Sequence, residues 1–281
     1  MSIAWILGAA ATAAAAVLTE RRLIYKPVRH VLQNPGHLDL AFEDVTFAAS
    51  DGTALNGWWL PRAGAHGTIL HCHGNKGSLG DRAWIARDLS ALPYNVFMFD
   101  YRGYGLSRGG PTAAGTRLDV FAAWDEVRRR LGGADHPPIA LFGSSLGGAT
   151  AAQLAAERPV RCLILEGTFT STLDMGRRFY PWLFPRLTCH NRYETLAKVR
   201  AFEMPLLVAH SPDDAVIPFD MGRALYDAAP SAHKRFVELG GPHGEYTWRT
   251  SPGYREAFAD FLAEHLPAPA AVTSLRPSGS A

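Results

Sequence analysis

The sequence predicts an α/β fold in which a mostly parallel sheet of eight strands is flanked by helices. Short apolar runs alternate with longer segments that carry apolar residues at three- and four-residue steps, the pattern of strands alternating with helices. Several runs are hydrophobic throughout, as expected for parallel strands that are buried on both faces. With 281 residues, 47% of them hydrophobic and 19% charged, the chain is also large and apolar enough to bury a substantial core.

Eight runs are the candidate strands, in chain order Asp44–Ala48, Leu55–Leu60, Thr68–His71, Val96–Phe99, Ile139–Phe142, Cys162–Leu165, Leu206–Ala209 and Arg235–Leu239. The helical patterns are Leu79–Leu92, Arg117–Leu131, Leu146–Glu157, Phe219–Ala229 and Gly253–Leu266. After the third strand the two types alternate, which implies right-handed crossovers and helices on both faces of the sheet. In such sheets the active site lies beyond the carboxyl ends of the strands, so the residues that follow each strand are the candidates for function.

The first 19 residues carry no charged side chain and are mostly alanine and large apolar residues. As a helix, about 18 residues span roughly 27 Å, just short of a hydrocarbon core of about 30 Å. We therefore expect a membrane anchor, with a cleaved signal peptide as the alternative, although no Lys or Arg precedes the apolar run. The positive charges that follow predict a cytoplasmic catalytic domain, with export as the alternative; they are Arg21, Arg22, Lys26 and Arg29.

The chain is expected to have one folded domain. No linker rich in Pro, Ser or Gly divides residues 40–266, so residues 20–266 are assigned to a single domain behind the helix of residues 1–19. Residues 267–281 consist mainly of Pro, Ala, Ser and Gly and are expected to form a disordered tail.

Composition excludes several functions. A net charge of +2 provides no basic field for nucleic acid. The chain has three cysteines, none at CxxC spacing, so neither a disulfide framework nor a structural zinc site is expected; they are Cys72, Cys162 and Cys189. His71 and His73 have no third ligand nearby, and we expect neither a metal nor a cofactor.

The pattern G-x-S-x-G occurs at residues 105–109 and again at residues 143–147. The chemistry of this pattern requires a strand, a tight turn that carries the serine, and then a helix. The second copy follows an apolar run and leads into a helical pattern, whereas the first runs into Gly110-Pro111, which would stop a helix. Ser145 is therefore the predicted nucleophile, and Ser107 is interpreted as a loop residue.

A serine hydroxyl needs a base, and on this kind of sheet the order along the chain is Ser, then Asp or Glu, then His. The histidines that follow Ser145 are His190, His210, His233, His243 and His265. Only His243 lies in a loop just after the last predicted strand, and it is the predicted base.

The acid is expected in the loop that follows the preceding strand, where Asp213 and Asp214 are adjacent. Glu166 follows another strand and is interpreted as a structural acceptor. The tetrahedral intermediate needs two backbone N–H donors, for which we expect Leu146, next to the nucleophile, and Asn75, in the loop after the third strand.

Several stretches together resemble one family: residues 23–27, 51–58, 73–75, 99–105, 143–148, 166–171 and 214–218. The chain is similar to the α/β-hydrolase superfamily, and within it to Bem-type serine hydrolases related to membrane-tethered α/β-hydrolase-domain proteins, some of which are depalmitoylases. The family's acid is followed by two residues and then Ile or Val and Pro, which selects Asp214. The chain departs from the family pattern at Ser211, at Pro242 before His243, and in having no cysteine before Cys72.

The resemblance implies a serine hydrolase that cleaves carboxylic ester or thioester bonds through an acyl-enzyme, without a cofactor. Residues 167–204 would form a short cap, and the aromatic stretch 179–185 could line an acyl pocket, rest on a membrane or simply pack. The alternatives are a catalytically silent, membrane-tethered binding protein on the same fold, and a serine peptidase or acyltransferase.

Overall fold

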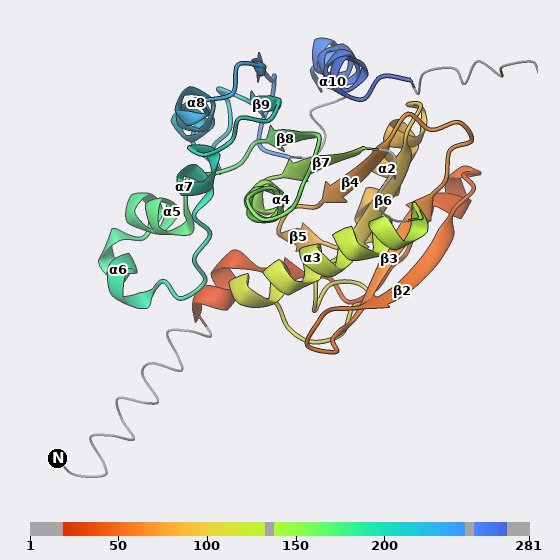
Figure 1. Cartoon of the computed structure of the whole chain (residues 1–281). Coiled ribbons are helices and arrows are strands. Elements are labelled where there is room, and N and C mark those ends of the chain that lie inside the picture. Colours follow the sequence, from red (N-terminus) through yellow and green to blue (C-terminus); the bar gives the residue numbers. More distant parts are fainter. Residues whose placement is uncertain (1–18, 133–137, 245–249, 269–281) are drawn as a thin grey trace, which may run out of the picture.

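The computed structural model describes residues 19–132, 138–244 and 250–268. Eight strands form one sheet in the order β10-β9-β8-β7-β4-β6-β3-β2 (Figure 1). Their bounds are β2 Glu43–Ala48, β3 Ala54–Leu60, β4 Thr68–Cys72, β6 Asn95–Asp100, β7 Ile139–Ser144, β8 Cys162–Glu166, β9 Leu206–His210 and β10 Lys234–Glu238. β3 pairs antiparallel with both β2 and β6, and the other pairs are parallel. The mostly parallel eight-stranded sheet predicted from the sequence is confirmed.

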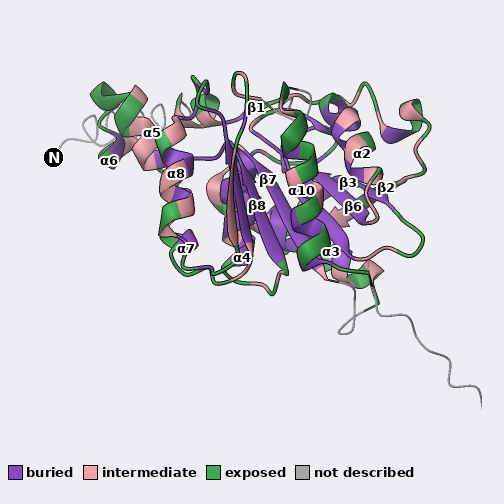
Figure 2. Ribbon diagram, turned by 90° about the horizontal axis from the view of Figure 1, so that it is seen from above, coloured by how far each residue is buried: buried purple, intermediate pink, exposed green. Residues whose placement is uncertain are grey.

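Helices cover both faces of this sheet, as predicted. On one face lie α3 (Ala113–Arg130), α4 (Leu146–Ala155), α7 (Thr195–Val199) and α8 (Phe219–Ala228). On the other lie α2 (Ala83–Ser90) and α10 (Pro252–His265). The six inner strands are almost entirely buried, which agrees with their apolar sequences, whereas the edge strands β2 and β10 are partly exposed (Figure 2).

The differences from the predicted elements have local causes. The helix predicted from Arg117 begins at Ala113, because the Thr112 side chain accepts a hydrogen bond from the Gly115 N–H and caps the helix there. The segment predicted as one helix from Leu79 starts with a 3-10 turn, η2 (Leu79–Arg82). A ribbon of β1 (Lys26–Pro27) and β5 (Lys76–Gly77) was not predicted, since two-residue strands leave no periodicity in a sequence.

The cap consists of α5 (Thr172–Phe179), η3 (Pro181–Leu183) and α6 (Pro185–Thr188). It projects from one end of the molecule, where few of its side chains are buried (Figure 2). Beside it lies the helical segment 19–24, whose Glu20 carboxylate accepts hydrogen bonds from the backbone N–H groups of His190 and Asn191. The chain therefore enters the domain at the cap.

The predicted anchor falls almost wholly on residues 1–18, which lie outside the described residues, as do residues 269–281 of the predicted tail. Over the described ranges, no helix combines the length and apolar character needed to cross a bilayer. Cys72 and Cys162 are buried, as their apolar surroundings in the sequence predicted.

Candidate active site

Ser145 occupies a sharp turn between β7 and α4. Its backbone has φ 54° and ψ −119°, a region that residues other than glycine rarely adopt. Such a conformation costs of order 1–3 kcal/mol and persists only where the surroundings hold it. The Ser145 N–H donates to the Glu166 carbonyl at 2.8 Å, and the Thr168 hydroxyl donates to the Ser145 carbonyl at 2.6 Å. Contacts from the neighbouring strand therefore maintain the strained turn.

Glycines on both sides of Ser145 allow backbone segments to pack unusually closely. A Cβ at Gly143 would overlap the Gly147 backbone, and a Cβ at Gly147 would overlap the Cys72 carbonyl. The second contact presses the start of α4 against the end of β4, which leads directly to Asn75. The glycines of G-x-S-x-G thus join the serine turn to the loop that carries the other predicted N–H donor.

Three side chains from separate loops meet at this turn. The imidazole of His243, in the loop after β10, has Nδ1 2.6 Å from Asp214 Oδ2 and Nε2 3.2 Å from Ser145 Oγ. Asp214 lies in the loop after β9, and β7, β8, β9 and β10 are parallel, so the loops at their carboxyl ends lie at the same edge. The structure brings Ser145, His243 and Asp214 together in one hydrogen-bonded chain, and Pro242 leaves the imidazole within reach of the serine.

Of the two adjacent carboxylates, only Asp214 faces the histidine. Asp213 is exposed, whereas the Asp214 side chain is 2% exposed. Asp214 Oδ1 accepts hydrogen bonds from the N–H groups of Val216 at 2.8 Å and Ile217 at 2.7 Å, which leaves Oδ2 for His243. The loop itself therefore orients this carboxylate.

His210 is a further contributor that the sequence reasoning considered only as a base. Its fully buried Nε2 donates to the Ile217 carbonyl at 2.9 Å and lies 3.5 Å from Asp214 Oδ2. Burial alone would raise the pKa of Asp214, but hydrogen bonds from His210, His243 and the Ile217 N–H together lower it below its ordinary value. The sequence feature that could have identified His210 is its position at the end of the strand that leads into the loop of Asp214.

The remaining candidate histidines serve elsewhere. The rings of His233 and His265 lie 5.9 Å apart, and His265 also packs edge-on against Phe261 at 4.7 Å. His265 lies at the end of α10 but is only 8% exposed, and burial lowers its pKa. At His190 the backbone, rather than the ring, binds Glu20.

The two residues predicted to supply the backbone N–H donors, Asn75 and Leu146, line the same cavity as Ser145. Leu146 is the first residue of α4, and Asn75 precedes β5. The side-chain amide of Asn75 donates to the Ile24 carbonyl at 2.7 Å. The backbone carbonyl of Asn75 accepts from the Lys26 N–H at 3.0 Å and from the Tyr104 hydroxyl at 2.7 Å. In the described part of the chain, neither the Asn75 N–H nor the Leu146 N–H donates to a protein acceptor.

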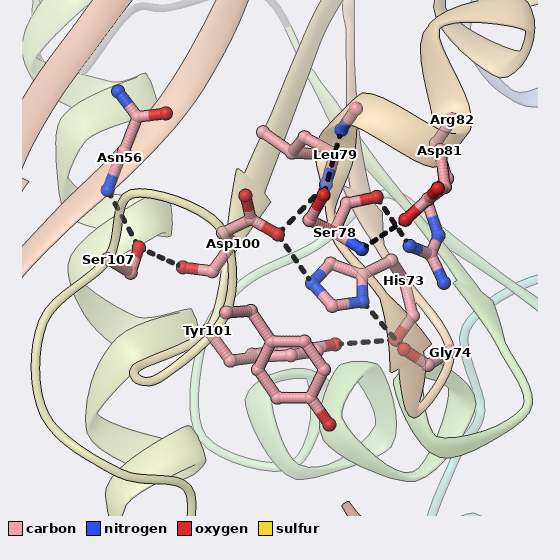
Figure 3. A network of polar contacts seen from close by, with 12 residues as sticks. Asn56, His73, Gly74, Ser78, Leu79, Asp81, Arg82, Asp100, Tyr101 and Ser107 are labelled. Atoms are coloured by element: carbon pink, nitrogen blue, oxygen red, sulfur yellow. Dashed lines mark hydrogen bonds and ion pairs between the residues drawn. The ribbon is translucent and has the colours of Figure 1, made fainter. Parts of the chain in front are cut away.

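A buried polar network supports the loop that leads to Asn75 (Figure 3). His73 Nδ1 donates to the Gly74 carbonyl at 2.6 Å, and His73 Nε2 lies 3.4 Å from Asp100 Oδ1. Ser107 belongs to this network, since its hydroxyl donates to the Asp100 carbonyl at 2.7 Å and accepts from the Asn56 N–H at 2.9 Å. Ser107, the serine of the first G-x-S-x-G copy, is therefore a buried residue whose hydroxyl makes structural hydrogen bonds.

The serine turn opens into a cavity of about 1050 Å³. Apolar side chains of the cap and of the loop after β8 line the cavity: Phe169, Met175, Phe179, Tyr180, Leu183 and Pro185. Leu23 and Ile24 from the entering helix also line the cavity, as do Lys26 and Lys76, which are register partners in the β1–β5 ribbon. Among the residues described, no three His, Cys, Asp or Glu side chains gather in a way that could hold a metal.

Comparisons with known proteins agree with this architecture. The family model described as "alpha/beta hydrolase fold" matches residues 67–188. The chain is 33% identical over 278 residues to the α/β hydrolase domain-containing protein WAV2 of Arabidopsis thaliana, covering 86% of this chain and 89% of that one. It is 34% identical over 224 residues to the lysophosphatidylserine lipase ABHD12 of Xenopus tropicalis, covering 69% of this chain and 57% of the lipase. The structure of the Pyrococcus furiosus esterase Pf2001 superimposes with a TM-score of 0.73 at 20% identity, covering 86% and 98% of the two chains.

Proposed function

Because this chain belongs to the α/β-hydrolase family, we propose that it is a serine hydrolase that cleaves carboxylic ester or thioester bonds through an acyl-enzyme. Ser145 is the nucleophile, His243 the general base and Asp214 the acid that orients His243. The observation that supports these roles is the continuous hydrogen-bonded chain, 2.6 Å from Asp214 to His243 and 3.2 Å from His243 to Ser145.

In the first step, Ser145 Oγ attacks the acyl carbon while its proton moves to His243 Nε2. The Nδ1–H of His243 stays hydrogen-bonded to Asp214, whose lowered pKa keeps the carboxylate ionised beside the imidazolium. The negative oxygen of the tetrahedral intermediate accepts from the N–H groups of Asn75 and Leu146, each of which contributes about 3 kcal/mol in the transition state.

Collapse of this intermediate breaks the bond to the alcohol or thiol, which leaves with the proton that His243 returns. A water molecule then attacks the Ser145 ester, and His243 accepts its proton. The second tetrahedral intermediate uses the same two N–H donors and releases a carboxylic acid. Ser145 regains its proton from His243, so the cycle is balanced without a cofactor.

We further propose that the substrate carries a medium or long acyl chain. The cavity is large enough for one, and its wall beneath the cap is apolar, which favours hydrocarbon over a polar group. The relatives named as a lipase and an esterase act on ester bonds and agree with this class. An anchor formed by residues 1–19, with the catalytic domain of residues 20–266 in the cytoplasm, would bring the site close to lipid substrates.

Labelling with a fluorophosphonate probe tests the nucleophile. The wild-type chain should be labelled and Ser145→Ala should not, with a loss of turnover on the order of 10⁶-fold. Ser107→Ala is the matched control, because it removes the serine of the other G-x-S-x-G copy and should keep the label. No labelling of either protein would favour a catalytically silent binding protein, and equal labelling of both would assign the nucleophile to a residue other than Ser145.

Nitrophenyl esters of graded chain length test the substrate class. The ratio kcat/KM should rise with acyl length until the apolar wall beneath the cap is filled. A flat profile in an active enzyme would remove the acyl-pocket part of the proposal while leaving the serine mechanism intact.

A further inference from the structure

The cap exposes an unusual concentration of large apolar side chains. Nine such side chains are exposed over the described residues, and five of them come from one stretch of eight residues: Tyr180, Trp182, Leu183, Phe184 and Leu187, here called the cap patch. Trp182, Phe184 and Leu187 are 66%, 70% and 79% exposed. Single apolar residues on a surface are ordinary, but a contiguous group indicates an interaction site.

Phe184 is also held in a strained backbone. It links η3 to α6 at φ 46° and ψ 63°, the left-handed region, where a bulky side chain is an outlier. A glycine would adopt this conformation without strain. The Phe184 ring is mostly exposed, so burial within the described residues does little to offset the strain at this position.

Positive charges outnumber negative ones around the cap patch. Residues 175–193 contain no Asp or Glu and four arginines: Arg177, Arg178, Arg186 and Arg192. Arg177 and Arg178 make only long ion pairs, at 3.4 Å to Asp174 and 3.7 Å to Asp220. The exposed Arg186 guanidinium makes no hydrogen bond or ion pair within the described ranges. An apolar surface rimmed by cations fits an apolar partner with anionic groups at its boundary.

The position of the cap patch connects it to the site. Tyr180 and Leu183 belong to the patch and also line the cavity that contains Ser145. The exposed Leu23 of the entering helix lines the same cavity, and Glu20 fastens that helix to the end of the cap. The described chain therefore begins on this side, at residue 19.

We propose that the cap patch docks on the surface of an anionic lipid bilayer, with Trp182, Phe184 and Leu187 in the interface and the arginines at the headgroups. Tyrosine, tryptophan and arginine beside apolar residues are the composition that such interfaces favour. A second copy of this chain is a poorer partner, since it would bring one arginine rim against another. If the proposed hydrolase function holds, an acyl chain can pass from the bilayer into the cavity without crossing water.

Depth-dependent fluorescence quenching tests the docking directly and needs no enzymatic activity. Full-length wild type and Trp182→Phe are mixed with phosphatidylglycerol-containing vesicles, with and without brominated phosphatidylcholine. Every other tryptophan, including Trp5, is present in both proteins, so the difference between them reports Trp182. Quenching and a blue shift in this difference signal are expected, and an unchanged difference signal overturns the proposal.

Vesicle partitioning tests the individual contacts. Leu187→Ser should weaken binding about tenfold, the factor expected when one partly inserted side chain is lost. Phe184→Gly should weaken binding similarly without lowering Tm, because glycine relieves the left-handed backbone. Arg186→Ser should weaken binding to anionic vesicles but not to phosphatidylcholine alone. Leu32→Ser is the matched control, since Leu32 is 75% exposed outside the cap, and should bind as wild type.

Two further measurements separate the competing explanations. Each variant should keep its kcat on a short, soluble nitrophenyl ester, so a failure of the proposed hydrolase function appears there as inactive wild type and leaves the binding results intact. Sedimentation velocity should show the same oligomeric state for wild type and the Leu187→Ser variant. If this variant instead dissociates an oligomer and binds vesicles as wild type does, the cap patch is a protein interface and the proposal is overturned.

Discussion

The turn at Ser145 makes a stability prediction that does not depend on catalysis. Ser145→Ala and Ser145→Gly both remove the hydroxyl, so they differ only in backbone preference. At φ 54° and ψ −119°, alanine keeps a strain of order 1–3 kcal/mol that glycine avoids. Glycine loses about 0.5–1 kcal/mol through its greater freedom in the unfolded chain. Ser145→Gly should therefore be the more stable variant, by up to about 2.5 kcal/mol or a few degrees in Tm.

Ser144 provides the matched control, because it is the last residue of β7 and has ordinary strand geometry. At this position Ser144→Gly should be less stable than Ser144→Ala by about 0.5–1 kcal/mol, the reverse order. Equilibrium unfolding in urea of all four variants measures both differences, provided that the m-values agree. If glycine is the less stable residue at both positions, Ser145 is not in a strained turn and the account of the nucleophile loses its structural basis.

Three other predictions concern the acid and the glycines. Asp214→Asn should reduce kcat about 10⁴-fold by favouring the wrong His243 tautomer, whereas Asp213→Asn should leave kcat nearly unchanged; comparable losses in steady-state assays would contradict the assignment of the acid. Because the pKa of Asp214 is lowered on folding, its ionisation stabilises the fold above the unfolded-state value of 3.8, and this contribution is lost as pH falls through the lower folded value. The gap in Tm between wild type and Asp214→Asn should therefore shrink below about pH 3.8, and a gap that widens there would refute the linkage. Gly147→Ala forces α4 away from the Cys72 carbonyl and should cost about 10²–10³ in kcat through misaligned N–H donors, while Gly253→Ala, at an open helical position, should leave kcat unchanged and raise Tm slightly.

Local sequence patterns were sufficient for the strands of the large sheet. Each buried strand is encoded by its own apolar run, so the predicted bounds differ from the observed ones by at most two residues at either end. The same patterns were insufficient for the cap. Its turn η3, the residues flanking that turn and the short helix α6 carry exposed apolar residues, and an apolar side chain in a sequence does not reveal whether the fold covers it.

The sequence by itself determined the α/β architecture and singled out Ser145, because a strand, a turn and a helix in succession leave a local signature around G-x-S-x-G. It also narrowed the base to His243 through its position after the last strand. Asp214 was selected over Asp213 only by resemblance to the family motif, and tertiary structure decided that it meets the imidazole, because this contact joins loops after different strands. Tertiary structure also decided that His210, four residues before Asp214, is buried beside it. Hydrogen-bond direction and burial across such distances depend on how strands are arranged side by side, which no single segment encodes.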